Sequence, residues 1–472
     1  MSFLFALLRH AAVLVAAASA GALVAAPWVP GGGRSRLASA ERAAWGTAVG
    51  LTLIAASFPL ALLLGIRPGW VPFLALVAAA AAASLLRPAA GLAAGDAAPA
   101  APSLSRGTAA ALRAIAVLGV ALFALRALTE PMWANDFLAI WGLKGKTIYA
   151  LSAVPDRLYA DPSLTFSHPE YPLGIPFLYA GLASLAGGWD DHAAAVLFPI
   201  IQVATLCGLA GWLRRRGVPR AVTLAAVAVL ALDLPLYTGS HVGLADIPLS
   251  FFALLLGASL SDAADGTDAG AAARLALASL LAVATKNEGL FLAAAAVVIG
   301  LVATRGARRR RDVALAIVLP ALLVLVPHRI WRGSARLKDF DFGLLTPSRW
   351  GELASRIVET ARNEALHVLL PALTIVVALA ALFALGRSVS WADRLLVLAA
   401  CAGATYLALP ALGVVPGHPE AGPLFLVRTA VARTFSALGP LVAAGLAGRL
   451  GGLVTGSASV PAVHPADPRY IP

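Results

Sequence analysis

Asp136 is the first side chain in this sequence that could do acid–base chemistry. It lies in WANDFLAIW, directly after a long apolar run, with Trp133, Phe137 and Trp141 around it. A carboxylate in such a partly shielded place is well placed to act as a general base that takes a proton from a hydroxyl. The alternative is that Asn135 or Asp136 only caps the helix that follows.

Lys286 and Glu288 interrupt another long apolar run, in the segment ATKNEG at 284–289. Side chains two residues apart do not face each other on a regular helix, but a turn ending at Gly289 would bring them together. Lys286 would then suit an anion such as a phosphate, which it would bind as a compact point charge. Glu288 would be its partner. The alternative is a charge pair that only closes a hairpin.

Asp246 opens the apolar run of GLADIPLSFF, five residues after His241. An N-terminal cap with a proline just inside the helix is a strong structural explanation for it, and the functional alternative is contact with substrate. His168, Glu170 and Tyr171 lie in SHPEYPLGIP at the start of the next apolar segment, where a solvated turn set by the two prolines is the structural explanation. The sequence has no HExxH and no paired cysteines, so we expect no metal and no cofactor.

The segment FLAIWGLKGKTIYALS places Lys144 and Lys146 beside Trp141 and Tyr149 at roughly helical spacing, which suits an amphipathic helix in a membrane interface. YPLGIPFLYAGLASLAGG is apolar but broken at its start by proline and glycine, and we expect it to be interfacial or half inserted. Further along, Arg433 either extends to lipid headgroups or binds a phosphate.

The composition places these residues in a membrane protein. Of the 472 residues, 60% are hydrophobic and 13% are charged, and the mean hydropathy is +0.84. A soluble protein has about 25% charged residues. The net charge of +12 comes largely from arginines in short loops such as 214–220 and 305–311, which is typical of cytoplasmic loops rather than of nucleic-acid binding. We therefore expect membrane lipids, and no nucleic acid, as partners.

Apolar runs predict an all-α, polytopic transmembrane protein with about 13 transmembrane helices. The first run has no early positive charge, so we expect a retained helix rather than a cleaved signal peptide. The expected spans are 4–27, 45–66, 69–86, 108–128, 192–213, 221–237, 247–261, 272–287, 289–304, 312–328, 366–386, 394–412 and 433–450.

With the basic loops in the cytoplasm, the segments 129–191 and 329–365 and the KNEG turn lie on the outer side. The expected parts are N-terminal helices with a cytoplasmic linker (1–107), a catalytic core including the outer loop 129–191 (108–328), and a second outer loop with C-terminal helices (329–472).

Four stretches together resemble one family: NDFLAIWGLKGKTIY (135–149), HPEYPLGIPFLYA (168–180), GLADIPLSFF (243–252) and ATKNEG (284–289). Their order and spacing are similar to those of polytopic GT-C class glycosyltransferases that use lipid-linked sugars, such as protein mannosyltransferases and aminoarabinose transferases. The resemblance covers about 135 to 290.

The resemblance implies an inner-membrane enzyme whose active site faces the periplasm or cell exterior, and a polyprenyl-phosphate sugar as donor. The acceptor would be a glycan, lipid or protein. The resemblance also implies that Asp136 is the catalytic acidic residue. Asn135 stands where many members have a second acid used with a metal, so a metal-free site is expected.

In this interpretation Lys286, and after it Arg433, stabilises the phosphate leaving group, while Asp246 and Glu288 bind sugar hydroxyls or hold the lysine. Trp141, Lys144, His168, Glu170 and Tyr171 would complete the substrate-binding side. The first alternative is a transporter or lipid flippase, which also places charges at depth. The second alternative is a membrane scaffold without catalytic activity, which gives no reason for so many charges on one face.

Overall fold

A computed structural model of the chain describes residues 3–29, 36–85, 104–156, 158, 161–233, 236–238, 241–266, 270–332, 346–363, 390–412 and 436–455. Across these residues the chain is helical and contains no strand, which confirms the predicted all-α class. The expected span 366–386 and the candidate Arg433 lie outside the described residues.

Six helices are long and apolar enough to cross a membrane. They are α1 (Phe3–Ala25), α2 (Arg36–Leu63), α4 (Arg106–Thr129), α8 (Leu197–Arg215), α10 (Asp246–Asp265) and α13 (Ala307–Arg332). Shorter apolar helices accompany them: α3 (Trp70–Leu85), α7 (Gly174–Ala186), α9 (Arg220–Ala231), α11 (Ala271–Thr285), α12 (Asn287–Ala303) and α19 (Gly439–Val454). The expected total of about thirteen crossings stays a prediction.

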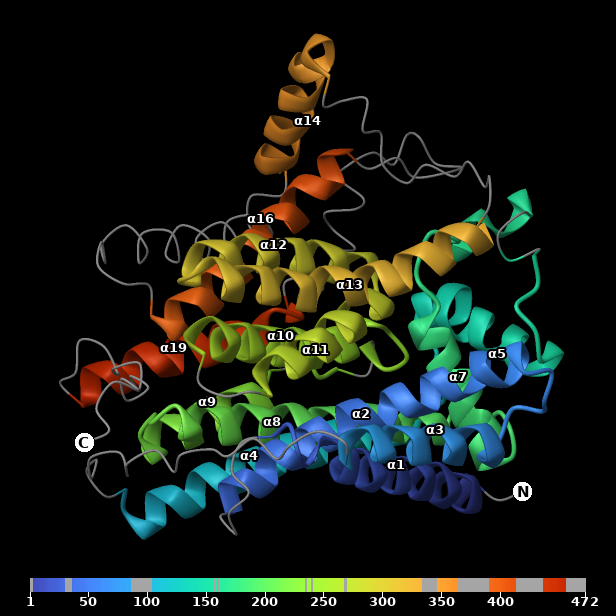
Figure 1. Cartoon of the computed structure of the whole chain (residues 1–472), viewed down its shortest axis with the longest axis horizontal. Coiled ribbons are helices and arrows are strands. Elements are labelled where there is room, and N and C mark those ends of the chain that lie inside the picture. The colour runs from blue at the N-terminus through green and yellow to red at the C-terminus, as the bar shows by residue number, and fades with distance from the viewer. Residues whose placement is uncertain are drawn as a thin grey trace.

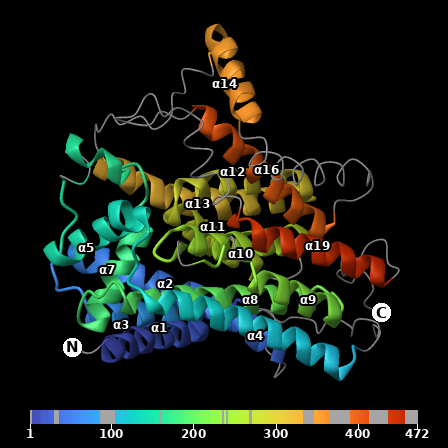
Figure 2. The same cartoon turned by 180° about the vertical axis from the view of Figure 1, so that it is seen from behind.

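The apolar helices run roughly along one direction in successive layers, from α1–α4 through α8–α9 and α10–α11 to α12–α13 (Figures 1 and 2). α10 lies at the centre, and every residue from 246 to 264 is buried. α16 (Trp391–Leu412) packs beside α12 and α19, while α14 (Trp350–Asn363) stands away from the layers. This arrangement surrounds the apolar α10 with other helices on all sides.

α4 and α13 are on the outside of the bundle, since only 17% of the apolar stretch of each is buried. α4 exposes Val117, Leu118, Leu122 and Leu125 along its length. A helix whose apolar side chains face outward along several turns is typical of a lipid-facing transmembrane helix. The part of the chain that the structure describes therefore has the surface of a membrane protein.

Buried ion pairs join the helices at one end of this body, which we call the arginine end. Asp262 of α10 lies 2.6 Å from Arg215, 2.5 Å from Arg216 and 3.0 Å from Arg274. Further pairs join Arg215 to Glu41, Arg216 and Arg394 to Asp265, and Arg449 to Asp393. Arg215 and Arg216 were expected to be loop cations, but they are paired with these acids.

The opposite end, which we call the site end, collects the other termini of the same helices. α10 begins here at Asp246, α11 ends at Thr285 and α12 begins at Asn287. α5 (Gly142–Leu151), preceded by the short π-helical turn η1 (Phe137–Trp141), and α7 also lie here (Figure 1). The helical body thus brings the separate polar motifs of the sequence to one end.

Candidate functional site

A buried charge cluster joins α10 to the α11–α12 turn. Lys286 has an extended backbone, with φ −162° and ψ 157°, and it separates the end of α11 from the start of α12. Its Nζ lies 3.1 Å from Asp246 Oδ1 and 2.8 Å from Glu288 Oε1. The side chains of Lys286 and Asp246 are only 2% and 1% exposed. The turn therefore brings Lys286 and Glu288 together as the sequence predicted.

This geometry changes two sequence interpretations. Asp246 is the first residue of α10 and Ala245 occupies the cap position, so Asp246 is not the N-cap. Its carboxylate accepts a hydrogen bond from Lys286 instead. Lys286 is buried between two carboxylates, and its pair with Glu288 is the one that the hairpin-closing alternative describes. Gly289 allows this close packing, because a Cβ there would lie 1.8 Å from the Ala282 carbonyl oxygen.

Asp136 directly precedes the π-helical turn η1. Its backbone is already helical, with φ −68° and ψ −27°, and its side chain makes no capping hydrogen bond to that turn. The next residue, Phe137, packs on Gly243: a Cβ on Gly243 would lie 2.8 Å from Phe137 Cβ. Gly243 also accepts a hydrogen bond of 2.9 Å from Tyr179. Asp136 is therefore held beside the loop that leads into α10 at Asp246.

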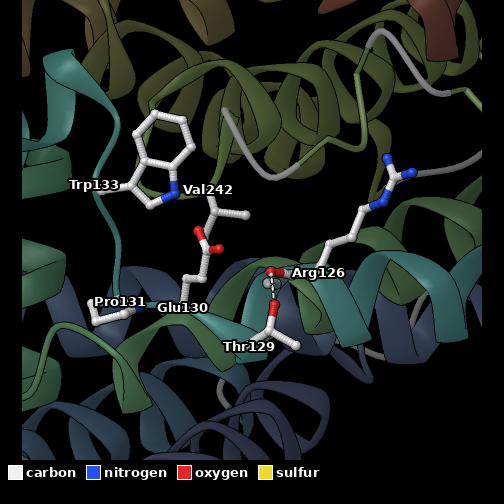
Figure 3. Close-up of a pocket in the computed structure, with 7 residues that line it drawn as sticks. Arg126, Thr129, Glu130, Pro131, Trp133 and Val242 are labelled. Atoms are coloured by element: carbon white, nitrogen blue, oxygen red, sulfur yellow. Dashed lines mark hydrogen bonds between the residues drawn. The ribbon is translucent and has the colours of Figure 1, made fainter.

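A small cavity lies where α4 passes into the Asp136 segment. Its volume is about 150 Å³, and it is lined by Arg126, Ala127, Thr129, Glu130, Pro131, Trp133 and Val242. Glu130 and Trp133 lie on one side and Arg126 on the other, and Thr129 donates a hydrogen bond of 3.1 Å to the Arg126 carbonyl (Figure 3). Val242 belongs to the same loop as Gly243, so this cavity adjoins the elements that hold Asp136.

Three aromatic rings are stacked at the other end of η1. Trp141 stacks on Tyr171 with ring centres 5.2 Å apart, and Tyr171 stacks on His168 at 4.9 Å. His168 Nδ1 lies 2.9 Å from Glu170 Oε1, and His168 has a left-handed φ of 50° that is uncommon for a residue with a side chain. The predicted substrate-binding residues of this motif therefore do form one compact group.

Lys144 is hydrogen-bonded to the backbone of this aromatic group. It is fully buried and donates a hydrogen bond of 2.6 Å to the His168 carbonyl oxygen. Lys146 is 61% exposed and lies 3.9 Å from Asp191. The segment was expected to be an amphipathic interfacial helix, and of its two lysines only Lys146 is exposed, whereas Lys144 is buried. α7, expected to be interfacial, is buried against α2 and α5.

The predicted residues thus form two clusters, Asp246–Lys286–Glu288 and Trp141–Lys144–His168–Glu170–Tyr171, with Asp136 on the segment between the cavity and the aromatic group. Arg126 and Glu130, which line the cavity, were not among the residues predicted from the sequence. Their signal was present, since both lie in ALRALTEPMW at the end of an apolar run. Over the described residues, no group of three or more His, Cys, Asp or Glu side chains could hold a metal ion.

No protein family, curated protein or solved structure matches this chain.

Proposed function

We propose that the chain is an integral-membrane glycosyltransferase that moves a sugar from a polyprenyl-phosphate donor to an envelope or lipid acceptor. The observation that carries the proposal is the position of Asp136, on the segment that leaves a cavity at the end of lipid-facing α4 and beside the loop that leads to the buried Asp246–Lys286–Glu288 cluster. A lipid-linked substrate needs such a place, where a reactive carboxylate meets both water and an apolar surface.

In the proposed reaction the Asp136 carboxylate takes the proton of the acceptor hydroxyl. The hydroxyl oxygen forms a bond to the anomeric carbon while the bond from that carbon to the phosphate oxygen breaks, so the sugar configuration inverts. The phosphate leaves with the bonding electrons and gains negative charge. A fixed cation near that oxygen stabilises the transition state, most of all where water is scarce.

Arg126 takes the place that the sequence analysis gave to Lys286. Lys286 is buried and already lies between two carboxylates, whereas Arg126 is exposed and makes no ion pair with any described residue. Arg126 lines the cavity in the last turn of α4, whose Leu118, Leu122 and Leu125 are exposed. The polyprenyl tail would lie along these leucines, and Lys286 would position the start of α10.

The test is sugar transfer by the purified protein carrying Asp136→Asn, in lipid nanodiscs with a polyprenyl-phosphate sugar donor. We expect transfer to fall by a factor of about 10² to 10⁴, the usual contribution of general-base catalysis. Asp156→Asn is the matched control, because this acid lies in a turn after α5 and outside both clusters. Wild-type transfer by the Asp136 variant at an unchanged melting temperature would contradict the assignment.

The alternative of a transporter or flippase predicts a different observation. Transporters commonly place their polar residues near the middle of the membrane, at broken helices. Here the candidate residues lie at helix termini at one end of the body. Movement of the lipid-linked sugar across liposomes without any covalent product would favour the transporter, and a glycosylated product would favour the enzyme.

A further inference from the structure

The turn between α12 and α13 carries a second arginine cluster that differs from the buried pairs of the arginine end. Arg305, Arg308, Arg309, Arg310 and Arg311 lie within seven residues of sequence and are all exposed. In contrast, Arg215, Arg216, Arg274 and Arg394 are paired with acids inside the body. The cationic charge presented to the surroundings at this end therefore comes chiefly from the α12–α13 turn.

Part of this cluster is held in place by the backbone. Arg310 Nε donates a hydrogen bond of 2.8 Å to the Thr304 carbonyl oxygen. The Arg309 guanidinium lies over Gly266 at the end of α10, since a Cβ on Gly266 would lie 2.4 Å from Arg309 Cζ. Asp312 pairs with Arg311 at 3.3 Å, and Arg305 and Arg308 make no ion pair with any described residue. The cluster therefore has more cations than acids, and two of its guanidinium groups, those of Arg309 and Arg310, are held against backbone groups.

The helices on either side of the turn present apolar side chains to the surroundings. Val298, Leu301 and Val302 of α12 are 62%, 40% and 75% exposed. Leu315 and Leu319 of α13 are 43% and 57% exposed. Exposed apolar surface next to a group of exposed arginines is complementary to a lipid, whose acyl chains would contact the apolar side chains and whose anionic headgroup would contact the arginines.

We propose that the α12–α13 turn binds an anionic phospholipid, with its phosphate on Arg308, Arg309 and Arg310 and its acyl chains along α12 and α13. Basic clusters at the end of a transmembrane helix attract anionic lipids, and each cation near the surface contributes about a fivefold gain in binding. Lipid is the occupant that the surface favours, because a soluble anion would leave the apolar faces of the two helices unused. This proposal does not depend on the proposed enzymatic activity.

The experiment compares delipidated protein in neutral detergent with added phosphatidylglycerol or phosphatidylcholine, following lipid binding by native mass spectrometry and stability by the melting temperature. We expect phosphatidylglycerol to bind and to raise the melting temperature, and phosphatidylcholine to do neither. In the triple variant Arg308→Gln, Arg309→Gln, Arg310→Gln, phosphatidylglycerol should bind at least about tenfold more weakly.

The control is the double variant Arg67→Gln, Lys146→Gln, which removes exposed cations that lie away from the arginine end. It should bind phosphatidylglycerol as the wild type does. Equal loss of binding in the triple variant and in the control, equal binding of the two lipids, or the same stabilisation by inorganic phosphate alone would each overturn the proposal. A folded triple variant is recognised by an unchanged melting temperature in the absence of lipid.

Discussion

At the scale of single residues, Lys286 illustrates how a charge can be kept inside an apolar protein. Its ammonium group lies 3.1 Å from Asp246 and 2.8 Å from Glu288, so the buried charges are stabilised mutually. Removing one member of a buried ion pair leaves the other charged and without compensation, which is far more costly than losing an exposed pair.

We therefore predict that Lys286→Met lowers the free energy of unfolding by about 3–5 kcal/mol. Lys146→Met is the control, because Lys146 is 61% exposed and its pair with Asp191 is long at 3.9 Å. An exposed pair of this kind contributes about 0–1 kcal/mol. Both values are measurable by denaturant titration in detergent. If Lys286→Met lost as little free energy of unfolding as Lys146→Met, the buried cluster would not stabilise the fold.

At the scale of elements, Gly243 links the candidate base to the core. Gly243 has a φ of 95°, and Phe137, the residue after Asp136, packs directly on its Cα. A side chain at this position would be strained and would also displace η1.

We predict that Gly243→Ala lowers the melting temperature and reduces sugar transfer, because the shift of Phe137 carries Asp136 with it. Gly65→Ala separates the two effects: Gly65 also has a positive φ, of 64°, but no atom lies within 4 Å of its added Cβ. The control should lose stability from backbone strain alone and keep its transfer activity. Full activity in the Gly243 variant would indicate that η1 does not position Asp136.

The elements themselves were largely predictable, because long apolar runs determine where a chain can cross a membrane. The run 108–128 is α4, Arg106–Thr129, and the run 247–261 is α10, Asp246–Asp265. α13 begins at Ala307, before its apolar run, because arginines are good helix formers that a hydropathy criterion does not count.

The details of the site were less predictable, since they depend on contacts between distant parts of the chain. The pairing of Lys286 with Glu288 follows from local sequence, but Asp246 as the second partner lies forty residues away. The burial of Lys144 was not visible either, because its hydrogen-bond acceptor, the His168 carbonyl, is a backbone group supplied by another segment.

At the scale of the whole molecule, the ion pairs around Asp262 connect α8, α10 and α11. Trp212 Nε1 adds a hydrogen bond of 3.2 Å to the same carboxylate. We predict that Asp262→Asn destabilises the protein by about 3–5 kcal/mol, since it leaves several buried guanidinium groups without their carboxylate.

Asp312→Asn is the control, as Asp312 pairs with Arg311 at the surface and is 49% exposed. Asp312→Asn should lower the free energy of unfolding by no more than about 1 kcal/mol. The measurement is the midpoint of chemical unfolding for the two variants in the same detergent. An Asp262 variant as stable as the Asp312 variant would mean that helix packing alone holds the arginine end together.

We predict the orientation of the molecule in the membrane from the end that keeps exposed arginines. Many arginines of the arginine end are used in ion pairs, but those from 305 to 311 stay exposed, and short loops with exposed arginine favour the cytoplasm.

In a background with Cys207→Ala and Cys401→Ala, we predict that Glu130→Cys reacts with a membrane-impermeant maleimide in right-side-out vesicles. Arg308→Cys should react only in inverted vesicles. Reaction of both cysteines from the same side would contradict the two-ended arrangement. If each cysteine reacted from the opposite side to the one expected, Asp136 would lie in the cytoplasm, where the proposed outward-facing transfer could not occur.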